Sequence, residues 1–573
     1  MHRLLPSFLM MYLSVLPVLA DRTHDSMIPE PPQYLGGYDS EKYLEVARTF
    51  ADTLIAHGRD VYGVTHTNFF LAMLDLSAQC LITEKDPNWD RDFNCEDYMR
   101  LARGANVYRD SDTLRALYAL TDLTDDKKYR EAADAEVSDL LRYGQSETTG
   151  LLAWGEHMVY NVLRDCVEHW RHEMEIPLPP MEQLWNVNSE AMLRYVDGIM
   201  KCHIYNPNTF DYDRHGHYYT GGFDDPAVRG KWIKHSGLFT IAFAFAYSKS
   251  GDDRYKQWAL KITHNFWDSR EGVADLPADL GRGTSHTSTQ IPLLAWYLLH
   301  AYQYMPDPML KEAAVHYMRR WARGAYDPSL GGYVDSVVLK DGLPGELRPL
   351  KPWGDVGWCE LTGRTLALAA KVADDPGLLL HAQRLFAQYA IVPMPPKTMP
   401  HHVAYAIENA LDLYELTKDR NYLYWARYYS QSALDGFFHN GLIRESLDGY
   451  IYNNSSMPGC LAEAWLRLYQ VEEKEPCRWN IPDRWEWNRE IPVQLVFAKA
   501  SVPSSMECIV SDDDGTVSII PFRVDSPKVD ISIPSRKDYQ GIRRIRIVSN
   551  QIENGNWIES PVAISMNSYG PVI

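Results

Sequence analysis

The sequence predicts a mainly α-helical fold: an (α/α) toroid, or barrel, of six or seven helical hairpins followed by a small C-terminal β domain. Two observations lead to this prediction. Apolar residues recur with a helical period from about residue 40 to 475, and the period changes to two after about residue 485. The predicted organisation is a signal peptide at 1–20, an (α/α) barrel domain at 21–484 and a β-sheet domain at 485–573.

Four stretches show the helical period most clearly, with apolar residues at spacings of three and four. They predict helices at 113–123, 238–248, 292–304 and 361–373. Between helices a short polar turn recurs, and each turn contains an aspartate that can cap the next helix. The steps between such aspartates are 54, 68 and 44 residues, from Asp253 to Asp307, Asp375 and Asp419. Steps of this length indicate an array of helical hairpins.

The predicted loops favour a closed toroid over an open solenoid, because several are rich in glycine and aromatic residues. These loops lie at 212–223, 266–276, 326–336 and 437–453. In the C-terminal part, period-two alternation broken by Pro, Gly, Asp and Asn predicts five short strands. They lie at 493–500, 517–524, 529–533, 542–548 and 562–566, and the acidic run at 512–515 is expected to form a turn.

Composition excludes several classes of protein. Apolar residues make up 45% of the 573 residues and charged residues 23%, which is typical of a globular protein. The formal net charge of −19 argues against a nucleic-acid partner, which requires a basic face. The 36 Tyr and 17 Trp residues have two explanations. They can pack between helices, or they can form flat platforms for sugar rings.

The N-terminus predicts export. Residues 1–3 are short and basic, residues 4–19 are almost wholly apolar, and 18–20 form a small-residue cleavage pattern. We therefore expect a signal peptide that is removed after Ala20, and a periplasmic or extracellular protein. No later apolar run approaches the roughly 18 residues that span a bilayer, so no membrane span is expected.

The densest group of chemically active residues lies at 211–219, where His215 and His217 can direct two imidazoles at one point. Asp213 could orient either ring. Upstream, the segment at 154–157 is expected to open a helix, and the segment at 171–175 to lie near the end of that helix. The two segments add histidines and carboxylates without thiolates, a donor set suited to divalent Mn, Co, Ni or Zn.

Basic residues near predicted loop-to-helix junctions are candidates for binding anionic groups, since arginine grips carboxylates at two points. The candidates are Arg109, Lys234, His235, Arg282 and His286. Carboxylates offer a different chemistry, because an inverting glycoside hydrolase needs an acid and a base about 6.5–9.5 Å apart. The candidates for that pair are Asp213, Asp355, Glu360 and Glu445.

Short motifs within residues 40–475 resemble polysaccharide lyase family 2, the metal-dependent pectate lyases. The motifs are the stretch 106–120, Gly155-Glu156-His157, His172-Glu173 and Arg214-His215. The resemblance implies an (α/α)7 barrel and cleavage of galacturonan by β-elimination. It also implies that His157, Glu173 and His215 bind the metal and that Arg214 is the catalytic base. The interval from His157 to Glu173 is shorter than the family suggests, so Glu156, His172 or His217 could replace an assigned ligand.

The chemistry fits these residue types. A divalent metal, Ca included, can stabilise the charge that develops when a uronate loses its C5 proton. Arginine is ordinarily a poor base because its unperturbed pKa exceeds about 12, so this role requires burial and neighbouring cations. The sequence therefore predicts a secreted lyase that cleaves a uronate-containing, pectate-like polysaccharide, with further basic residues holding the flanking uronates.

Three other functions stay open at the level of sequence. The first is a glycoside hydrolase, inverting or of the unsaturated-glucuronyl type, on an (α/α)6 toroid with paired carboxylates. The second is a sugar epimerase that uses paired histidines such as His235 and His286. The third is a glycan-binding protein without catalysis. Sensitivity to a chelator separates the lyase from the hydrolase, and any turnover eliminates the binding protein.

Overall fold

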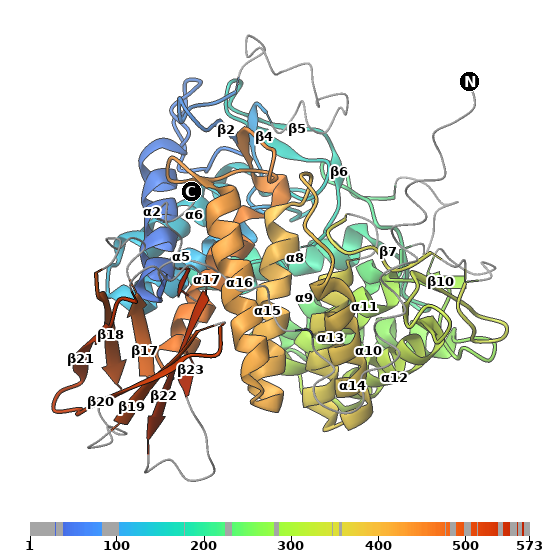
Figure 1. The fold of residues 1–573 in the computed structure, drawn as a ribbon. Helices are drawn as coiled ribbons and strands as arrows, with labels where there is room; N and C mark the ends of the chain where they lie inside the picture. The colour runs from blue at the N-terminus through green and yellow to red at the C-terminus, as the bar shows by residue number, and fades with distance from the viewer. Residues whose placement is uncertain are drawn as a thin grey trace, which may run out of the picture.

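The structure is a computed structural model of the chain (Figure 1). It describes residue 29 and the ranges 38–82, 102–176, 178–223, 232–279, 286–345, 348–354, 358–475, 477–481, 489–497, 506–512, 514–536, 542–549, 558–559 and 564–565. The predicted signal peptide, Arg282 and Asp355 lie outside the described residues.

The protein is mainly helical, as predicted. The helices of the described residues are α2 Glu41–His57, α5 Ser111–Thr124, α6 Lys128–Tyr143, α7 Met181–Val187, α8 Ser189–Cys202, α9 Lys234–Ser250, α10 Asp253–Asp268, α11 Gln290–Tyr304, α12 Pro308–Ala325, α13 Cys359–Ala373, α14 Pro376–Ala390, α15 Pro400–Thr417, α16 Arg420–Phe437 and α17 Pro458–Glu472, with a 3₁₀ turn at Asn454–Ser456. The four stretches with the clearest helical period lie within α5, α9, α11 and α13. None of the helices in the described ranges is both long enough and apolar enough to span a membrane.

The recurring aspartates cap helices, as their position in the turns predicts. The side chains of Asp307, Asp375 and Asp419 accept hydrogen bonds from the first backbone N–H groups of α12, α14 and α16. In the first of these turns the cap of α10 is Asp252, while Asp253, from which the spacing was counted, is the first residue of the helix. The donor–acceptor distances include 2.9 Å to Arg254 N and 2.8 Å to Gly377 N. Each cap satisfies a donor that the helix itself leaves unpaired, which stabilises the helix by about 1 kcal/mol.

The helices form an inner series and an outer series. In the inner series each helix packs on the next, in the order α5, α17, α15, α13, α11 and α9. Helices α16, α14, α12 and α10 pack on the outside of α15, α13, α11 and α9. Burial follows this division: α9 is buried without interruption from His235 to Ala246, whereas α10 buries one face. A helix that is apolar on all sides has to be enclosed by other elements, so α9 and α11 belong inside.

Short strands occupy the loops that connect these helices. They are β2 Met73–Asp75, β3 Gly104–Ala105, β4 Val159–Asn161, β5 Cys166–Glu168, β6 Arg171–His172, β7 Ile204–Asn206, β8 Asp211–Tyr212, β9 Gly216–His217, β10 His286–Ser288, β11 Tyr326–Asp327, β12 Gly332–Tyr333, β13 Ser336–Val338, β14 Phe438–His439, β15 Leu442–Ile443 and β16 Ile451–Asn453. Two of the predicted glycine- and aromatic-rich loops therefore contain small hairpins, β11–β12 and β14–β15.

The C-terminal part forms two antiparallel sheets beside α2 and α17, drawn in red in Figure 1. One sheet has the order β1-β17-β18-β21 and the other β20-β19-β22-β23, with β24 pairing β22. Their bounds are β1 Tyr38–Asp39, β17 Cys477–Ile481, β18 Ile491–Phe497, β19 Met506–Asp512, β20 Val517–Phe522, β21 Lys528–Ile533, β22 Ile542–Ser549, β23 Ile558–Glu559 and β24 Ile564–Ser565. Alternate residues of β18 and β19 are buried, which is the pattern expected where two sheet faces pack.

The five predicted strands correspond to β18, β20, β21, β22 and β24, but the sheets contain more. The sequence analysis missed β19, and it missed β17, which precedes the predicted boundary at residue 485. The N-terminal strand β1 also joins a C-terminal sheet by pairing with β17. The first residue of the acidic run at 512–515 belongs to a strand, because Asp512 is the last residue of β19. Its buried carboxylate pairs with Arg543 Nε at 2.8 Å.

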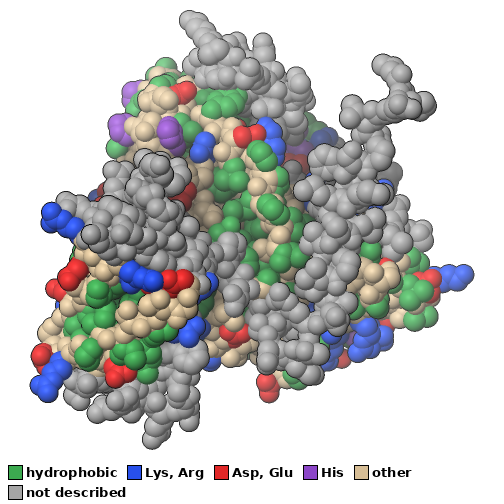
Figure 2. Space-filling model, in the orientation of Figure 1, with side chains coloured by type: hydrophobic (Ala, Val, Ile, Leu, Met, Phe, Trp, Pro, Cys, Tyr) green, Lys and Arg blue, Asp and Glu red, His purple; other side chains and the backbone are tan. Residues whose placement is uncertain are grey.

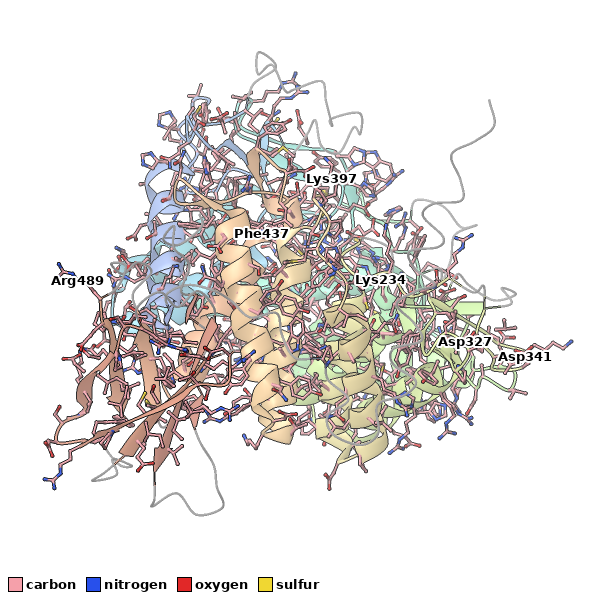
Figure 3. The ribbon with its side chains drawn as sticks, in the orientation of Figure 1. Lys234, Asp327, Asp341, Lys397, Phe437 and Arg489 are labelled. Atoms are coloured by element: carbon pink, nitrogen blue, oxygen red, sulfur yellow. The ribbon has the colours of Figure 1, made fainter. Side chains whose placement is uncertain are left out.

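The described surface carries charges of both signs. Acidic and basic side chains are interspersed on the face seen in Figure 2. Figure 3 shows Lys234 within the helical domain and Arg489 at the margin of the β domain. Lys234 is the first residue of the inner helix α9, and its side chain pairs with Glu175.

The outer helix α16 is joined to α17 by a buried ion pair, which yields a first prediction. Arg427 Nε and Nη2 donate to the Glu472 carboxylate at 2.6 and 2.8 Å, and both side chains are almost fully buried. Arg427→Leu removes both charged hydrogen bonds that Arg427 donates to the buried Glu472 carboxylate, so we expect a destabilisation of about 3–5 kcal/mol, measured as a lower urea midpoint. The double variant Arg427→Leu/Glu472→Leu should recover most of that loss. Equal loss in the single and double variants would contradict the role of the pair.

Candidate metal centre and active site

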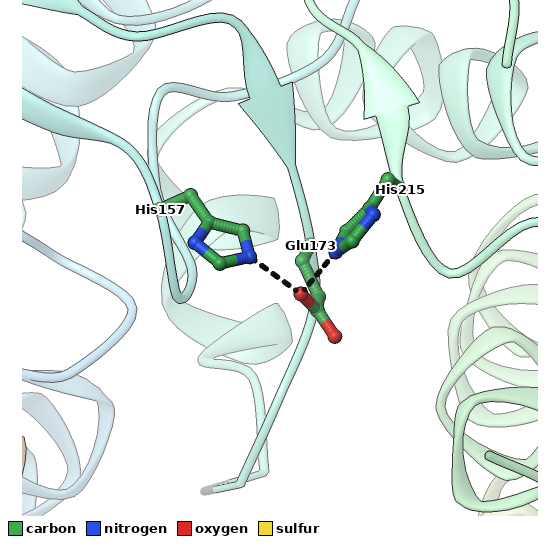
Figure 4. Close-up of side chains that lie close together, drawn as sticks. All are labelled: His157, Glu173 and His215. Carbon is green, nitrogen blue, oxygen red and sulfur yellow. Dashed lines mark hydrogen bonds and ion pairs between the residues drawn. The ribbon is translucent and has the colours of Figure 1, made fainter. Parts of the chain in front are cut away.

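The buried carboxylate of Glu173 is the centre of the site. Its Oε2 atom lies 3.1 Å from His157 Nε2 and 2.9 Å from His215 Nε2 (Figure 4). Its Oε1 atom lies 3.0 Å from Arg214 Nη1 and 3.0 Å from His235 Nε2. The structure therefore brings together the three predicted metal ligands and the predicted base around one side chain that is 0% exposed.

Strand pairing brings Glu173 and His215 together. Strand β6 runs antiparallel to β9, with His172 opposite Gly216. Glu173 follows His172 and His215 precedes Gly216, so this register brings Glu173 and His215 together. Glu173 also forms an isolated parallel bridge with Gly155, which places His157 beside it. The predicted helix that opens at Trp154 is wrong, since this segment leads into the hairpin β4–β5. A straight helix would have placed His157 and Glu173 on different sides, and the hairpin removes that difficulty.

Gly155 permits this close approach. Its φ of +97° lies in the left-handed region that glycine tolerates, and a Cβ atom there would lie 1.7 Å from the Glu173 carbonyl oxygen. The buried Asn106 side chain holds both peptide groups of Gly155. Asn106 Nδ2 donates to Gly155 O at 2.6 Å, and Gly155 N donates to Asn106 Oδ1 at 3.3 Å.

The donor set fits a divalent cation. One ligand atom each from His157, Glu173 and His215 lie within 4.8 Å of one another, and together they offer two imidazole nitrogens and one carboxylate oxygen. Burial by itself raises the pKa of Glu173, but its contacts with His157, His215 and His235 outweigh burial and hold that pKa well below the usual range. The carboxylate is therefore ionised, as a metal ligand must be.

The three alternative ligands have different surroundings. His172 is buried away from the cluster, with Nδ1 2.8 Å from His203 Nε2 and Nε2 accepting from Trp154 Nε1 at 3.1 Å. The ring of His217 stacks on Trp170, with centroids 4.6 Å apart. These contacts place both side chains outside the ligand cluster.

Glu156 is the alternative that lies beside the cluster. Its Oε2 atom is 3.8 Å from His157 Nε2 and 4.0 Å from Arg214 Nη1. Burial and the neighbouring carboxylates of Glu175 and Glu173 raise the pKa of Glu156 to about 8. Ligand oxygens of Glu156, Glu173 and Glu175 also lie within 4.8 Å of one another, so the site is rich in carboxylates.

Two of the predicted substrate-binding residues meet at Glu175. Arg109 Nη2 lies 3.1 Å from Glu175 Oε2, and Lys234 Nζ lies 3.2 Å from Glu175 Oε1. The Arg109 and Lys234 side chains keep 14% and 12% of their surface exposed. Glu175 lies in the segment 171–175 that was expected to supply carboxylates, but no role was predicted for it individually. In an extended segment, residues two apart lie on the same face, so Glu175 is expected on the face that carries Glu173.

The other predicted site residues are placed differently. His235 contacts Glu173 and is fully buried. His286 begins β10, which pairs with β13, and Arg282 lies outside the described residues. Asp213 accepts the His215 N–H at 3.0 Å and so holds the turn that carries Arg214 and His215.

The carboxylates considered for hydrolysis have local partners. Glu360 accepts the Trp353 N–H at 2.8 Å and lies 3.1 Å from His402 Nδ1, in a fully buried position. Glu445 accepts from Asn453 Nδ2 at 3.3 Å. Asp355, the remaining member of that group, lies outside the described residues.

Comparison with known proteins supports the family resemblance. Residues 93–279 match a family model described as periplasmic pectate lyase. A pectate disaccharide-lyase of Dickeya dadantii (strain 3937) is 24% identical over 197 residues, which are 30% of this chain and 36% of that protein. The chain thus matches about a third of the length of this curated relative. The resemblance to polysaccharide lyase family 2 is confirmed over the segment that contains His157, Glu173, Arg214 and His215.

The solved structures that match this chain are distant. A family 76 glycoside hydrolase from a bovine Bacteroides thetaiotaomicron strain has 13% identity and a TM-score of 0.43, covering 76% of this chain and 79% of its own. The unsaturated glucuronyl hydrolase of Bacillus sp. GL1 has 12% identity and a TM-score of 0.40, covering 75% and 97%. The cellobiose 2-epimerase of Bacillus thermoamylovorans B4167 has 10% identity and a TM-score of 0.42, covering 74% and 99%.

The tight contact at Gly155 predicts the effect of a single methyl group. Gly155→Ala should push the His157 segment away from Glu173, so we expect at least a tenfold weaker affinity for a divalent metal, a loss typical when ligand orientation is disturbed. The measurement is titration calorimetry of the chelator-treated protein with MnCl₂. Gly251→Ala is the matched control, because Gly251 also has a positive φ of +69° but meets nothing within 4 Å. Equal losses in the two variants would point to backbone strain alone.

Proposed function

We propose that this protein is an exported polysaccharide lyase that cleaves a uronate-containing, pectate-like polysaccharide by metal-assisted β-elimination. One observation carries the proposal: Arg214, His157 and His215 converge on the buried carboxylate of Glu173. All four residues lie in the segment that matches the periplasmic pectate lyase family. The family's description also supports a periplasmic or extracellular location.

In this proposal His157, Glu173 and His215 hold a divalent cation, with Mn, Co, Ni or Zn, or Ca, as the candidates. When bound, the cation would act as a Lewis acid toward the uronate carboxylate and make the C5 proton more acidic. The two imidazoles and the carboxylate arrive from three separate loop segments. The pairing of β6 with β9 and the bridge between Gly155 and Glu173 hold these three residues close together.

Arg214 is the proposed base. Its side chain is 27% exposed, so it can reach a sugar that lies over the buried ligands. In the reaction Arg214 acts in its neutral form, after its guanidinium has released a proton to solvent, and one of its nitrogens then accepts the C5 proton and restores the guanidinium. The C5–H electron pair becomes the C4–C5 double bond, and the C4–O bond breaks so that its electron pair leaves with the oxygen of the departing sugar.

Arg109 and Lys234 are the proposed contacts for uronate carboxylates next to the reacting sugar. Both cations are partly exposed and are held in place by Glu175. Glu175 lies two residues beyond Glu173, so this pair is adjacent to the ligands. A local basic pair of this kind allows an acidic protein of net charge −19 to bind a polyanion.

For the fold we propose that the inner series α5, α17, α15, α13, α11 and α9 belongs to a closed (α/α) toroid. The sequential packing of these helices and the outer layer of α16, α14, α12 and α10 support this arrangement. His157 and Glu173 lie on the connection between α6 and α7, Arg214 and His215 on the connection between α8 and α9, and Arg109 on the one that enters α5. A toroid places its cleft on such connections.

Ultraviolet absorbance tests the lyase proposal. The mature protein is incubated with a panel of polyuronates, with and without chelator, and with single metals added back. We expect a rising signal from a conjugated unsaturated uronate, suppressed by the chelator and restored by one of the metals. New reducing ends without that absorbance would refute β-elimination and indicate hydrolysis by a carboxylate pair.

Two substitutions separate the base from the metal ligands. We expect Arg214→Ala to lower turnover by about 10²–10⁴-fold, the usual contribution of a general base, with metal content near that of the wild type. His215→Ala should lose both activity and metal, because it removes a ligand. Initial rates and elemental analysis measure the two effects.

Arg270→Ala provides the matched control for Arg214→Ala. Both guanidinium groups lie over a tryptophan ring: Arg214 Cζ is 5.5 Å from the Trp232 centroid and Arg270 Cζ is 3.4 Å from the Trp267 centroid. Arg270, however, pairs with Asp275 outside the site. This variant should keep both activity and metal. Substantial turnover in Arg214→Ala would remove Arg214 as the base.

A further inference from the structure

His235 contacts the central carboxylate at Oε1, the oxygen that does not face His157 and His215. It is the second residue of α9 and is 0% exposed. Its Nε2 lies 3.0 Å from Glu173 Oε1, and its Nδ1 lies 3.0 Å from the backbone carbonyl oxygen of Trp232. Both ring nitrogens therefore face oxygens of the site, and the ring has no exposed surface with which to touch a sugar.

Trp232 supplies a rigid support for this histidine. Its φ of +65° is rare for a bulky residue and costs of the order of 1–3 kcal/mol, so other contacts must hold it. Its N–H donates to Asp279 O at 2.9 Å, and its carbonyl also accepts from the Tyr212 hydroxyl at 3.0 Å. Strained backbone of this kind concentrates at functional sites. The bonds to Asp279 and Tyr212 thus hold Trp232, whose carbonyl contacts His235.

The two oxygens of Glu173 consequently have separate partners. Oε2 faces His157 and His215, whereas Oε1 faces His235 and Arg214. Within the described residues, His235 does not belong to the group of ligand atoms that converge within 4.8 Å. A contact on the far oxygen limits rotation of the carboxylate and keeps Oε2 directed at the two imidazoles, which is how outer partners orient metal ligands.

We propose that His235 is a positioning residue, which holds Glu173 through Oε1 so that Oε2 is presented together with His157 and His215 to a divalent cation. This inference rests on the proposed metal site. It gives His235 a different role from the substrate contact or epimerase base expected from the sequence. Its effect on a substrate is indirect, through the position of the metal ligand.

Metal affinity of four proteins tests the proposal. The full-length mature wild type and the variants His235→Leu, His235→Asn and His235→Gln are stripped with chelator and titrated with MnCl₂ by calorimetry. Glutamine places its amide near the position of Nε2 and can donate to Glu173, whereas asparagine is too short to keep the contact and leucine cannot donate. We expect affinity to fall about 10–100-fold in His235→Leu and His235→Asn, and about threefold or less in His235→Gln.

The control for loss of a histidine from an inner helix is His300→Leu, at a half-buried position. His300 lies on the inner helix α11 with its ring centroid 4.3 Å from that of Trp296, away from Glu173, so metal affinity should be unchanged. If His235→Leu does not fold, the comparison of His235→Asn with His235→Gln decides. Wild-type affinity in His235→Asn, or equal losses in the asparagine and glutamine variants, would overturn the proposal.

The outcomes also separate this inference from the function on which it rests. A wild type that binds Mn²⁺ and shows chelator-sensitive lyase activity, with no effect of His235→Asn, refutes the positioning role alone. A wild type that binds neither Mn²⁺ nor another divalent metal of the panel refutes the metal site, and the role of His235 with it.

Discussion

The site depends on the burial of one negative charge. Moving a carboxylate out of water is costly, and it is tolerated only where hydrogen bonds and opposite charges compensate it. Glu173 is fully buried, and three histidines and an arginine surround its two oxygens. This requirement explains why residues from distant loops converge here, and why the turn at Trp232 keeps an unfavourable backbone conformation.

The scaffold divides the work between helices and short strands. The inner helices are apolar on nearly all sides and form the enclosed body of the protein. The site lies on short strands and turns that precede or connect them, with β6 paired to β9 and Gly155 bridged to Glu173. Side chains on paired strands hold defined positions, which a metal centre requires.

A second carboxylate repeats the pattern at the edge of the site. Glu175 is held by Arg109 and Lys234, so an anion anchors two cations that stay partly exposed. Glu173 thus holds three imidazoles and Arg214 around its carboxylate. Glu175 holds Arg109 and Lys234, whose partly exposed charges can contact an anion. The alternation of these two glutamates in one extended segment places both functions side by side.

Local patterns in the sequence determined much of this protein. The helical period predicted α5, α9, α11 and α13, and the aspartates predicted the caps, because both depend on residues only a few positions apart. The short motifs were sufficient for the resemblance that places His157, Glu173, Arg214 and His215 in one site. These signals are readable because helix formation and capping act over a single turn.

Tertiary structure decided the rest. The segment after Trp154 forms strands instead of a helix because β4 pairs with the distant β3 as well as with its neighbour β5, and the backbone passes Glu173 at Gly155. Strand β19 depends on β20 and β22 in the same way, and β17 on β1. The contact of His235 with Glu173 joins α9 to a loop 62 positions earlier. Pairing over such separations leaves no local pattern, so only the folded chain shows which histidine orients the central carboxylate.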